Sequence, residues 1–182
     1  MGQQDGRMNR RSVLAMLSGT LLSGCGFHPV YAPRTAAGGA SPVLADLARV
    51  SVGIIPDRQG QLLRQAIQDR LERGGIAADI GYDLSVNYGI SNEGAGILGD
   101  NSTTYARIIG RANWVLRAAS SPRAVITSGS ARAVDGYDYL DQQYFATDLA
   151  DEAVKRRLAN AVADQIALQL AAFFAKRTAA PG

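Results

Sequence analysis

The sequence predicts an α+β fold, a two-layer sandwich in which a small sheet of about four strands is covered on one face by two helices. Three segments between residues 82 and 134 alternate apolar and polar residues with a period of two, which is typical of strands with one buried face. The segments 61–73 and 148–176 instead repeat apolar residues at helical spacing. Helices packed over one face of a sheet are the simplest way to bury all these apolar faces. We therefore expect the order strand, helix, three strands, helix.

The first strand and the first helix follow a segment of tether composition. Residues 32–42 are mostly Pro, Gly, Ala, Ser and Thr, which suits a linker that holds a domain away from a membrane. Residues 47–55 are typical of a strand and end at Pro56. The helix at 61–73 ends at two glycines. Its apolar face consists of Leu62, Leu63, Ala66, Ile67 and Leu71.

The three later strands are predicted at 82–91, 103–119 and 124–134. In the first of them one face is apolar and the other polar, so we expect one face to be buried. A short connection at 120–123, Ser-Ser-Pro-Arg, joins the last two and favours antiparallel pairing. The apolar face of the first comprises Tyr82, Leu84, Val86, Tyr88 and Ile90, and its polar face comprises Asp83, Ser85, Asn87 and Ser91.

The closing helix is the clearest element of the sequence. Thr147 or Asp148 can cap it, and it runs to about Lys176. Acidic residues near its start and basic residues at its end suit the helix dipole. The residues at helical spacing are Val154, Leu158, Ala161, Val162, Ile166, Leu170 and Phe173.

The N-terminus has the composition of an export signal. Arg7, Arg10 and Arg11 precede an apolar stretch at 13–22, which is shorter than the roughly 20 residues that span a bilayer. The segment 22–25, Leu-Ser-Gly-Cys, resembles the lipobox of bacterial lipoproteins, whose cysteine is acylated and whose preceding bond is cut. We therefore predict a signal peptide over 1–24 and a lipidated Cys25. The alternative is an ordinary signal peptide with a chance cysteine.

The export route and the start codon stay open. Residues 10–14, Arg-Arg-Ser-Val-Leu, resemble a twin-arginine signal, although paired arginines are common in ordinary signals. Met8 is an alternative start that would leave a compact signal with two arginines.

Removal of the signal changes what the composition means. It leaves 158 of 182 residues, enough for one domain. The formal charge falls from +3 to about +1, because three arginines and Asp5 are lost. No basic run remains, so we expect no nucleic-acid partner. With Cys25 acylated, no cysteine is left for a disulfide or a thiolate metal site.

No motif in the sequence predicts catalysis, a metal or a cofactor. The segment 94–99 matches the spacing of a dinucleotide-binding loop, but another strand follows instead of the helix that this site requires. We therefore predict a hairpin loop there. His28 is the only histidine and lies three residues from the expected lipid anchor, where a general base would have no preorganised partner.

One face of the second long strand is basic. Arg107, Arg111 and Arg117 share their parity with Tyr105, Asn113, Ile109 and Val115, while the other parity suits a core. Guanidinium groups bind phosphate through a planar fork, so this face could hold an anionic lipid head group. The alternative is a solvated, edge-protecting charged face. A bulge at Gly110 would put Arg107 and Arg111 on opposite faces.

The segment 134–145 combines aromatic and acidic residues. Tyr137, Tyr139, Tyr144 and Phe145 could bind a protein, because aromatic side chains are enriched at interfaces. They could equally pack under the closing helix.

Two segments resemble one family. Residues 25–31, Cys-Gly-Phe-His-Pro-Val-Tyr, are similar to the mature start of the LptE family of lipopolysaccharide-assembly lipoproteins in its alphaproteobacterial form. Residues 144–153, 157–159 and 163–166 resemble that family's closing helix. The order of strands and helices also agrees.

The resemblance implies a protein that is not an enzyme and needs no cofactor. It implies an outer-membrane lipoprotein that sits on the periplasmic side of the LptD β-barrel or inside its lumen, helps it fold, and supports lipopolysaccharide transport to the cell surface. The expected organisation is a lipidated N-terminus and tether over 25–45, the domain over 46–177 and a tail over 178–182. Arg107 and Arg111, with Arg117, are the candidate lipopolysaccharide contacts. Two alternatives are a subunit of another envelope lipid-transport complex and a lipid-anchored envelope enzyme.

Overall fold

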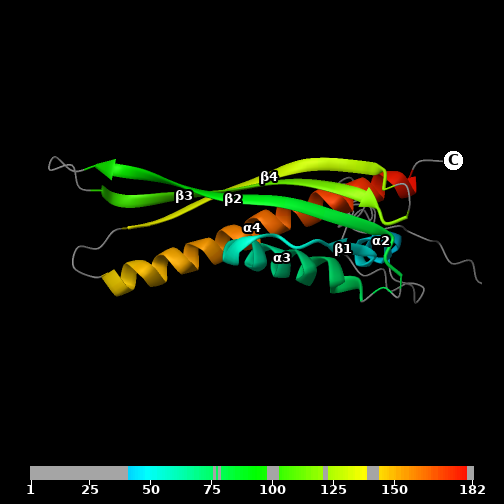
Figure 1. The fold of residues 1–182 in the computed structure, drawn as a ribbon, viewed down its shortest axis with the longest axis horizontal. Helices are drawn as coiled ribbons and strands as arrows, with labels where there is room; N and C mark the ends of the chain where they lie inside the picture. Colours follow the sequence, from blue (N-terminus) through cyan, green and yellow to red (C-terminus); the bar gives the residue numbers. More distant parts are fainter. Residues whose placement is uncertain are drawn as a thin grey trace, which may run out of the picture. The chain divides into compact units, whose positions relative to one another are not determined.

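The sheet and the described helices form two layers, with these helices on one face of the sheet (Figure 1). The computed structural model describes residues 41–75, 77, 79–97, 103–120, 123–138 and 144–179, so Cys25 and His28 lie outside the described residues. The predicted α+β sandwich is confirmed, and the described residues contain three α-helices where two were expected to cover the sheet. The elements are α2 (Pro42–Ala48), β1 (Val50–Val52), α3 (Asp57–Leu71), the 3-10 turn η1 (Glu72–Gly74), β2 (Tyr82–Ile97), β3 (Thr103–Ala118), β4 (Val125–Asp138) and α4 (Tyr144–Ala179).

The sheet has the order β1-β2-β3-β4. Strand β1 is parallel to β2, while β2, β3 and β4 pair antiparallel as successive hairpins. The bulge considered at Gly110 does not occur, because the register is continuous there and its irregularity lies between Leu116 and Arg117. A Cβ at Gly110 would lie 2.8 Å from the Tyr88 hydroxyl, so the glycine leaves room for that ring rather than bending the strand.

Helix α2 is an element that the sequence analysis missed. The strand expected at 47–55 is only Val50–Val52, and α2 occupies Pro42–Ala48 before it. Proline at the first position of a helix has a suitable φ and lacks an N–H that would have no partner. Val43 and Leu47, one helical turn apart, are both buried. A helix of seven residues carries too little periodicity to be recognised from the sequence.

Strand β2 is longer than expected and includes part of the glycine-rich segment. Gly94 pairs with Ala106 and Ile97 with Thr103, so the hairpin loop predicted at 94–99 is wrong for residues 94–97. Backbone pairing needs no large side chain, which is why the apolar alternation gave no sign of it. Residues 98 and 99 lie outside the described part of the chain.

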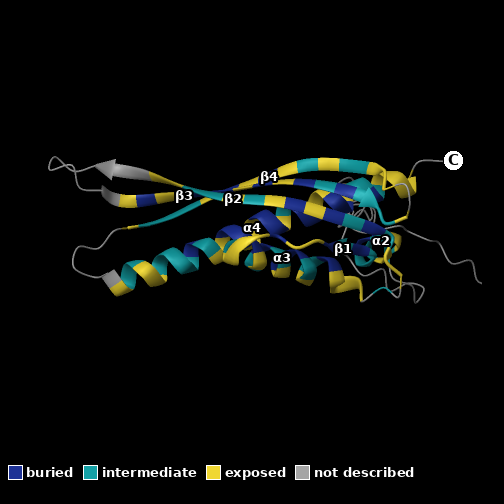
Figure 2. Cartoon of the chain, viewed as in Figure 1, coloured by how far each residue is buried: buried dark blue, intermediate teal, exposed yellow. Residues whose placement is uncertain are grey.

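The core lies between the inner face of the sheet and the helices. As expected, α3 buries Leu63, Ala66, Ile67 and Leu71, with Leu62 at the margin. Gly75, which follows η1, has a φ of 100°, a conformation that favours glycine. Buried residues alternate with more exposed ones along much of β2 and β3 (Figure 2).

Helix α4 begins at Tyr144, earlier than the predicted caps Thr147 and Asp148. Its predicted stripe is buried except for two positions: Ala161 is exposed, and Phe174 replaces Phe173 as the fully buried aromatic residue. The Phe174 ring lies 5.1 Å from that of Tyr82, between centroids. The helix is long and apolar enough to cross a membrane, but half of its most apolar window is buried within the fold.

In the aromatic segment 134–145, one described aromatic side chain packs against the core and another is exposed. Tyr137 is partly buried and packs against the core, as expected for packing under α4. Phe145 is 78% exposed on the first turn of α4. Tyr139 and the Tyr144 side chain lie outside the described part of the chain.

Candidate functional site

The face of the sheet that no described helix covers carries the arginines singled out from the sequence. Arg107 and Arg111 are exposed there, and Arg117 is half-buried on the same face. Because β3 is regular from Thr103 to Leu116, its odd-numbered side chains stay on this outer face. The predicted parity is therefore confirmed.

The outer face also holds an apolar residue in an unexpected state. Ile109, between Arg107 and Arg111 along the strand, is only 1% exposed although it points away from the main core. Its neighbour on β4 is Val134, which is 42% exposed. The row beside Arg111 and Arg132 is therefore apolar, and of its two residues on β3 and β4 only Val134 is exposed.

Register adds an arginine that the sequence analysis missed. Arg132 of β4 is exposed and lies directly opposite Arg111 of β3. Both the N–H and the C=O of Arg132 bond to the Gln165 side chain, at 3.1 and 3.0 Å, so they point away from β3. Arg111 and Arg132 are thus a non-hydrogen-bonded pair, the arrangement that brings opposing side chains closest, with Cβ atoms about 4.5–5.5 Å apart. The signal available beforehand was the parity of Arg132 in its strand, but its partner depends on register.

The acidic residues of this face lie beside the other arginines. Asp83 is opposite Arg117 across the β2–β3 pair and forms a long ion pair of 3.9 Å with Arg123. Glu93 is opposite Arg107. In the row that contains Arg111, the neighbouring residues are Gly89 on β2 and Arg132 on β4, and neither is acidic.

Among the described residues, Arg111 has one side-chain hydrogen-bond partner. Its Nη1 donates to the Ser91 hydroxyl at 2.9 Å, which orients the guanidinium but does not neutralise it. The comparable bond from Arg117 to the Ser85 hydroxyl is long, at 3.5 Å. Like charges placed directly opposite each other on a sheet are destabilising. The Arg111–Arg132 row is therefore the part of this face best suited to an added anion.

This topology removes the edge-protecting explanation for two of the predicted residues. Strand β3 is paired on both sides, so Arg107 and Arg111 have no sheet edge to protect. A guanidinium pair without a carboxylate can hold a phosphate oxygen with charge-assisted hydrogen bonds.

Interactions on the inner side hold β4, and thus Arg132, in place. Arg157 of α4 donates to Asp135 of β4 at 2.6 Å. The Gln169 side chain accepts from the Trp114 indole N–H and donates to the Ser130 carbonyl, both at 2.9 Å. Partial burial opposes ionisation of Asp135, but hydrogen bonds from Arg157 and from the Gly136 N–H outweigh it and lower the pKa of this carboxyl. The outer face is thus built on a strand that α4 fixes.

No cluster of potential metal ligands occurs among the described residues.

Comparison with known proteins identifies the chain's relatives. The model of the LptE family, described as lipopolysaccharide-assembly, matches residues 47–170. No curated protein matches the sequence.

Solved structures share the fold. A lipoprotein from Caulobacter crescentus CB15 is 24% identical with a TM-score of 0.59, covering 75% of this chain and 98% of its own. Lipoprotein B from Nitrosomonas europaea is 16% identical with a TM-score of 0.53, covering 69% and 83%. The rare lipoprotein B from Shewanella oneidensis is 12% identical with a TM-score of 0.52, covering 71% and 98%. At these identities the likeness shows the fold alone.

Proposed function

Because this chain belongs to the LptE family of lipopolysaccharide-assembly proteins, we propose that it is an outer-membrane lipoprotein that works with an LptD-type β-barrel. In this role it supports the transport of lipopolysaccharide and its insertion at the cell surface. The lipidated Cys25 would anchor it to the membrane, with the folded domain on the periplasmic side or inside the barrel lumen. The family is non-catalytic, and we propose no enzymatic activity or cofactor for this chain.

The observation that carries a direct role with lipopolysaccharide is the Arg111–Arg132 row. Two opposed arginines with no carboxylate beside them among the described residues favour an anionic ligand, and the exposed apolar residue Val134 lies in the next row along the strands. A glycolipid with phosphates beside acyl chains has both chemistries. Arg107 and Arg117 lie on the same side of the sheet but are opposite Glu93 and Asp83, so both are weaker candidates than Arg111, and the half-buried Arg117 is the weakest.

Binding to two forms of one glycolipid tests this role. We expect the purified protein to bind lipopolysaccharide more tightly than the same material after enzymatic removal of its lipid A phosphates. The difference should shrink as salt rises, because the Debye length falls from about 10 Å at 0.1 M to about 3 Å at 1 M. Equal affinity for both forms at low salt would contradict phosphate recognition by the arginine row.

Co-purification tests the partner. We expect the tagged protein, extracted from outer membranes in mild detergent, to bring down one large β-barrel protein that mass spectrometry identifies as LptD-like. Recovery of the components of a different lipid transporter instead would support the alternative envelope complex.

Substitution of the anchor tests the localisation. Cys25→Ala should abolish acylation and membrane attachment, because each buried acyl methylene contributes about 0.8 kcal/mol and several chains act together. Cell fractionation with an acyl label checks this. A mature Cys25→Ala protein that still fractionates with the outer membrane would contradict the proposed anchor.

A further inference from the structure

The two edges of the sheet differ in how their backbone groups are satisfied. At the β4 edge, side chains of α4 replace a neighbouring strand: Gln165 bonds to the N–H and C=O of Arg132, and Gln169 bonds to the C=O of Ser130. This edge is therefore closed to another strand where α4 covers it.

At the β2 edge, strand β1 is too short to pair with the whole length of β2. Strand β1 pairs only with residues 82–84 of β2, and its last bond runs from the Gly53 N–H to the Leu84 carbonyl at 2.9 Å. The chain then leaves the sheet and enters α3 at Asp57. Strand β2 continues to Ile97. Beyond Leu84, no strand among the described residues lies on the side of β2 that β1 occupies at residues 82–84.

The direction of the unpaired groups follows from the Leu84 bond. Backbone groups of alternate residues in a strand point to opposite sides, so the even-numbered residues after Leu84 also point toward the open edge. These residues are Val86, Tyr88, Ile90 and Asn92, and no backbone hydrogen bond on this side joins them to any described residue. A row of N–H and C=O groups at two-residue spacing is matched by the backbone of another extended chain.

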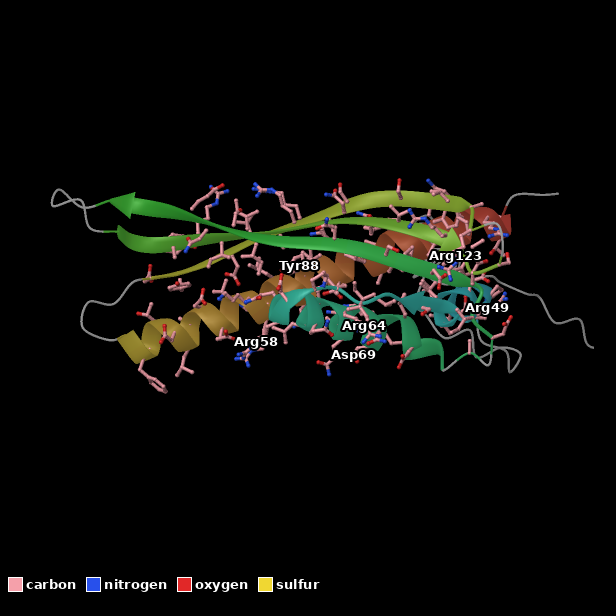
Figure 3. The ribbon with its side chains drawn as sticks, in the orientation of Figure 1. Arg49, Arg58, Arg64, Asp69, Tyr88 and Arg123 are labelled. Atoms are coloured by element: carbon pink, nitrogen blue, oxygen red, sulfur yellow. The ribbon has the colours of Figure 1, made fainter. Side chains whose placement is uncertain are left out.

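A hollow lies beside this open edge on its helix side. One cavity of about 620 Å³ is lined by Tyr88, Gly89 and Ile90 of β2, by residues 56–60 at the start of α3, and by Lys155 of α4. A second, of about 490 Å³, also contacts Ile90 and Lys155. Tyr88 points to this side of the sheet, between β2 and the helices (Figure 3). Alternate side chains of a strand added beside β2 would enter this space.

The open edge lacks the usual features that prevent strand addition. From Val86 to Glu93 the strand has no proline, and its one charged residue, Glu93, belongs to the outward-facing parity. Natural sheets commonly block such an edge with inward-pointing charges, proline or bulges. An edge without them, beside a hollow that takes side chains, has the features of a strand-addition site.

We propose that the β2 edge from Val86 to Asn92 binds an extended segment of the barrel partner as an additional strand. The segment would place alternate side chains in the hollow, whose lining includes Arg58 and Lys155 beside Tyr88 and Ile90, and polar or acidic side chains outward, beside the arginines of the outer face. A second copy of this chain fits less well, because it would add its own arginines to that face. The identity of the partner rests on the proposed function, whereas the strand-addition geometry does not.

A proline at the open edge tests the proposal. Asn92 is exposed and its N–H points away from β3, so Asn92→Pro removes one outward donor and leaves the β2–β3 ladder in place. Two matched controls separate edge pairing from other effects. Asn92→Ala removes the side chain but keeps the N–H, and Ser128→Pro removes an outward N–H at the opposite edge. Circular dichroism and the midpoint of thermal unfolding establish that each variant is folded.

The readout is recovery of the barrel with each tagged full-length variant, together with photocrosslinking from benzoylphenylalanine placed at Asn87 beside the open edge. We expect Asn92→Pro to lower barrel recovery and the Asn87 crosslink about tenfold, while both controls stay near wild type. Wild-type recovery of the barrel in Asn92→Pro would overturn the proposal and leave the proposed function intact. A crosslink from Asn87 to a second copy or to this chain itself would also overturn it. Failure of the wild-type protein to recover any barrel would instead count against the proposed function.

Discussion

The two faces of β3 are formed by alternating residues of one strand, and they differ in burial and charge. The inner face places Trp114 and Leu116 in the core, and the outer face places Arg107 and Arg111 outside it. The role of an inner residue follows from its own side chain, because burial of a large apolar side chain is favourable whatever its neighbours are. The electrostatic environment of an outer residue depends instead on the residue opposite it on the neighbouring strand. Arg111 and Arg117 are both arginines on the outer face, yet Arg111 lies opposite Arg132 and Arg117 lies opposite Asp83.

The largest expected effect is on the inner face. Leu158 of α4 is 1% exposed, so Leu158→Ala should lower the free energy of unfolding by about 2–5 kcal/mol. Urea denaturation measures it. Leu168→Ala is the matched control on the same helix, because Leu168 is 56% exposed and should change stability by no more than about 0.5 kcal/mol. Equal losses for both leucines would contradict the packing of α4 on the sheet.

A smaller effect is expected at the hydrogen bond between Trp114 and α4. Trp114→Phe keeps most of the buried ring but removes the N–H that donates to Gln169, so stability should fall by about 0.5–1.5 kcal/mol, apart from any loss of packing. Amide hydrogen exchange of β4 sharpens the test, because Gln169 also holds the Ser130 carbonyl. Unchanged exchange near Ser130 would show that this bond does not position β4.

The smallest effect is pH-dependent and also concerns the attachment of β4. The pKa of Asp135 is lowered in the folded state, so its contribution to stability is present above the ordinary aspartate pKa of about 3.9 and is lost as pH falls through the lower folded value. Because Arg157 is largely exposed, the contribution should stay below about 1 kcal/mol. Asp135→Asn should therefore be less stable than wild type at pH 7 and approach it under strongly acidic conditions. A stability difference that is independent of pH would rule out the ion pair as its cause.

The inner face could be predicted well from the sequence, because buried positions form a periodic pattern of apolar residues within each segment. The alternation in 82–91, the stripe of α3 and most of the stripe of α4 each follow from period and polarity alone. Helix α2 was missed because seven residues are too few for a period, and residues 94–97 because glycines pair without an apolar pattern.

The outer face could be predicted only in part. Parity placed Arg107, Arg111 and Arg117 together, but the partner of each depends on register, which turns and long-range packing set. For that reason neither the Arg111–Arg132 pair nor the carboxylate beside Arg117 could be predicted. The burial of Ile109 was missed on the same grounds, since its neighbours on adjacent strands are distant in sequence.

Lipopolysaccharide affinity, measured for two double variants that remove equal charge from this face, tests the central claim most directly. Arg111→Gln with Arg132→Gln removes both positive charges from the row that contains no carboxylate. Arg117→Gln with Arg123→Gln removes the two arginines beside Asp83. We expect the first pair to weaken binding about tenfold or more, since a hydrogen bond to a charged group contributes about 1.5–3 kcal/mol, and the second to stay within about twofold of wild type. Equal weakening by both would show that total charge, not the opposed pair, attracts the ligand. Unchanged binding in the first would contradict a lipopolysaccharide contact at this row.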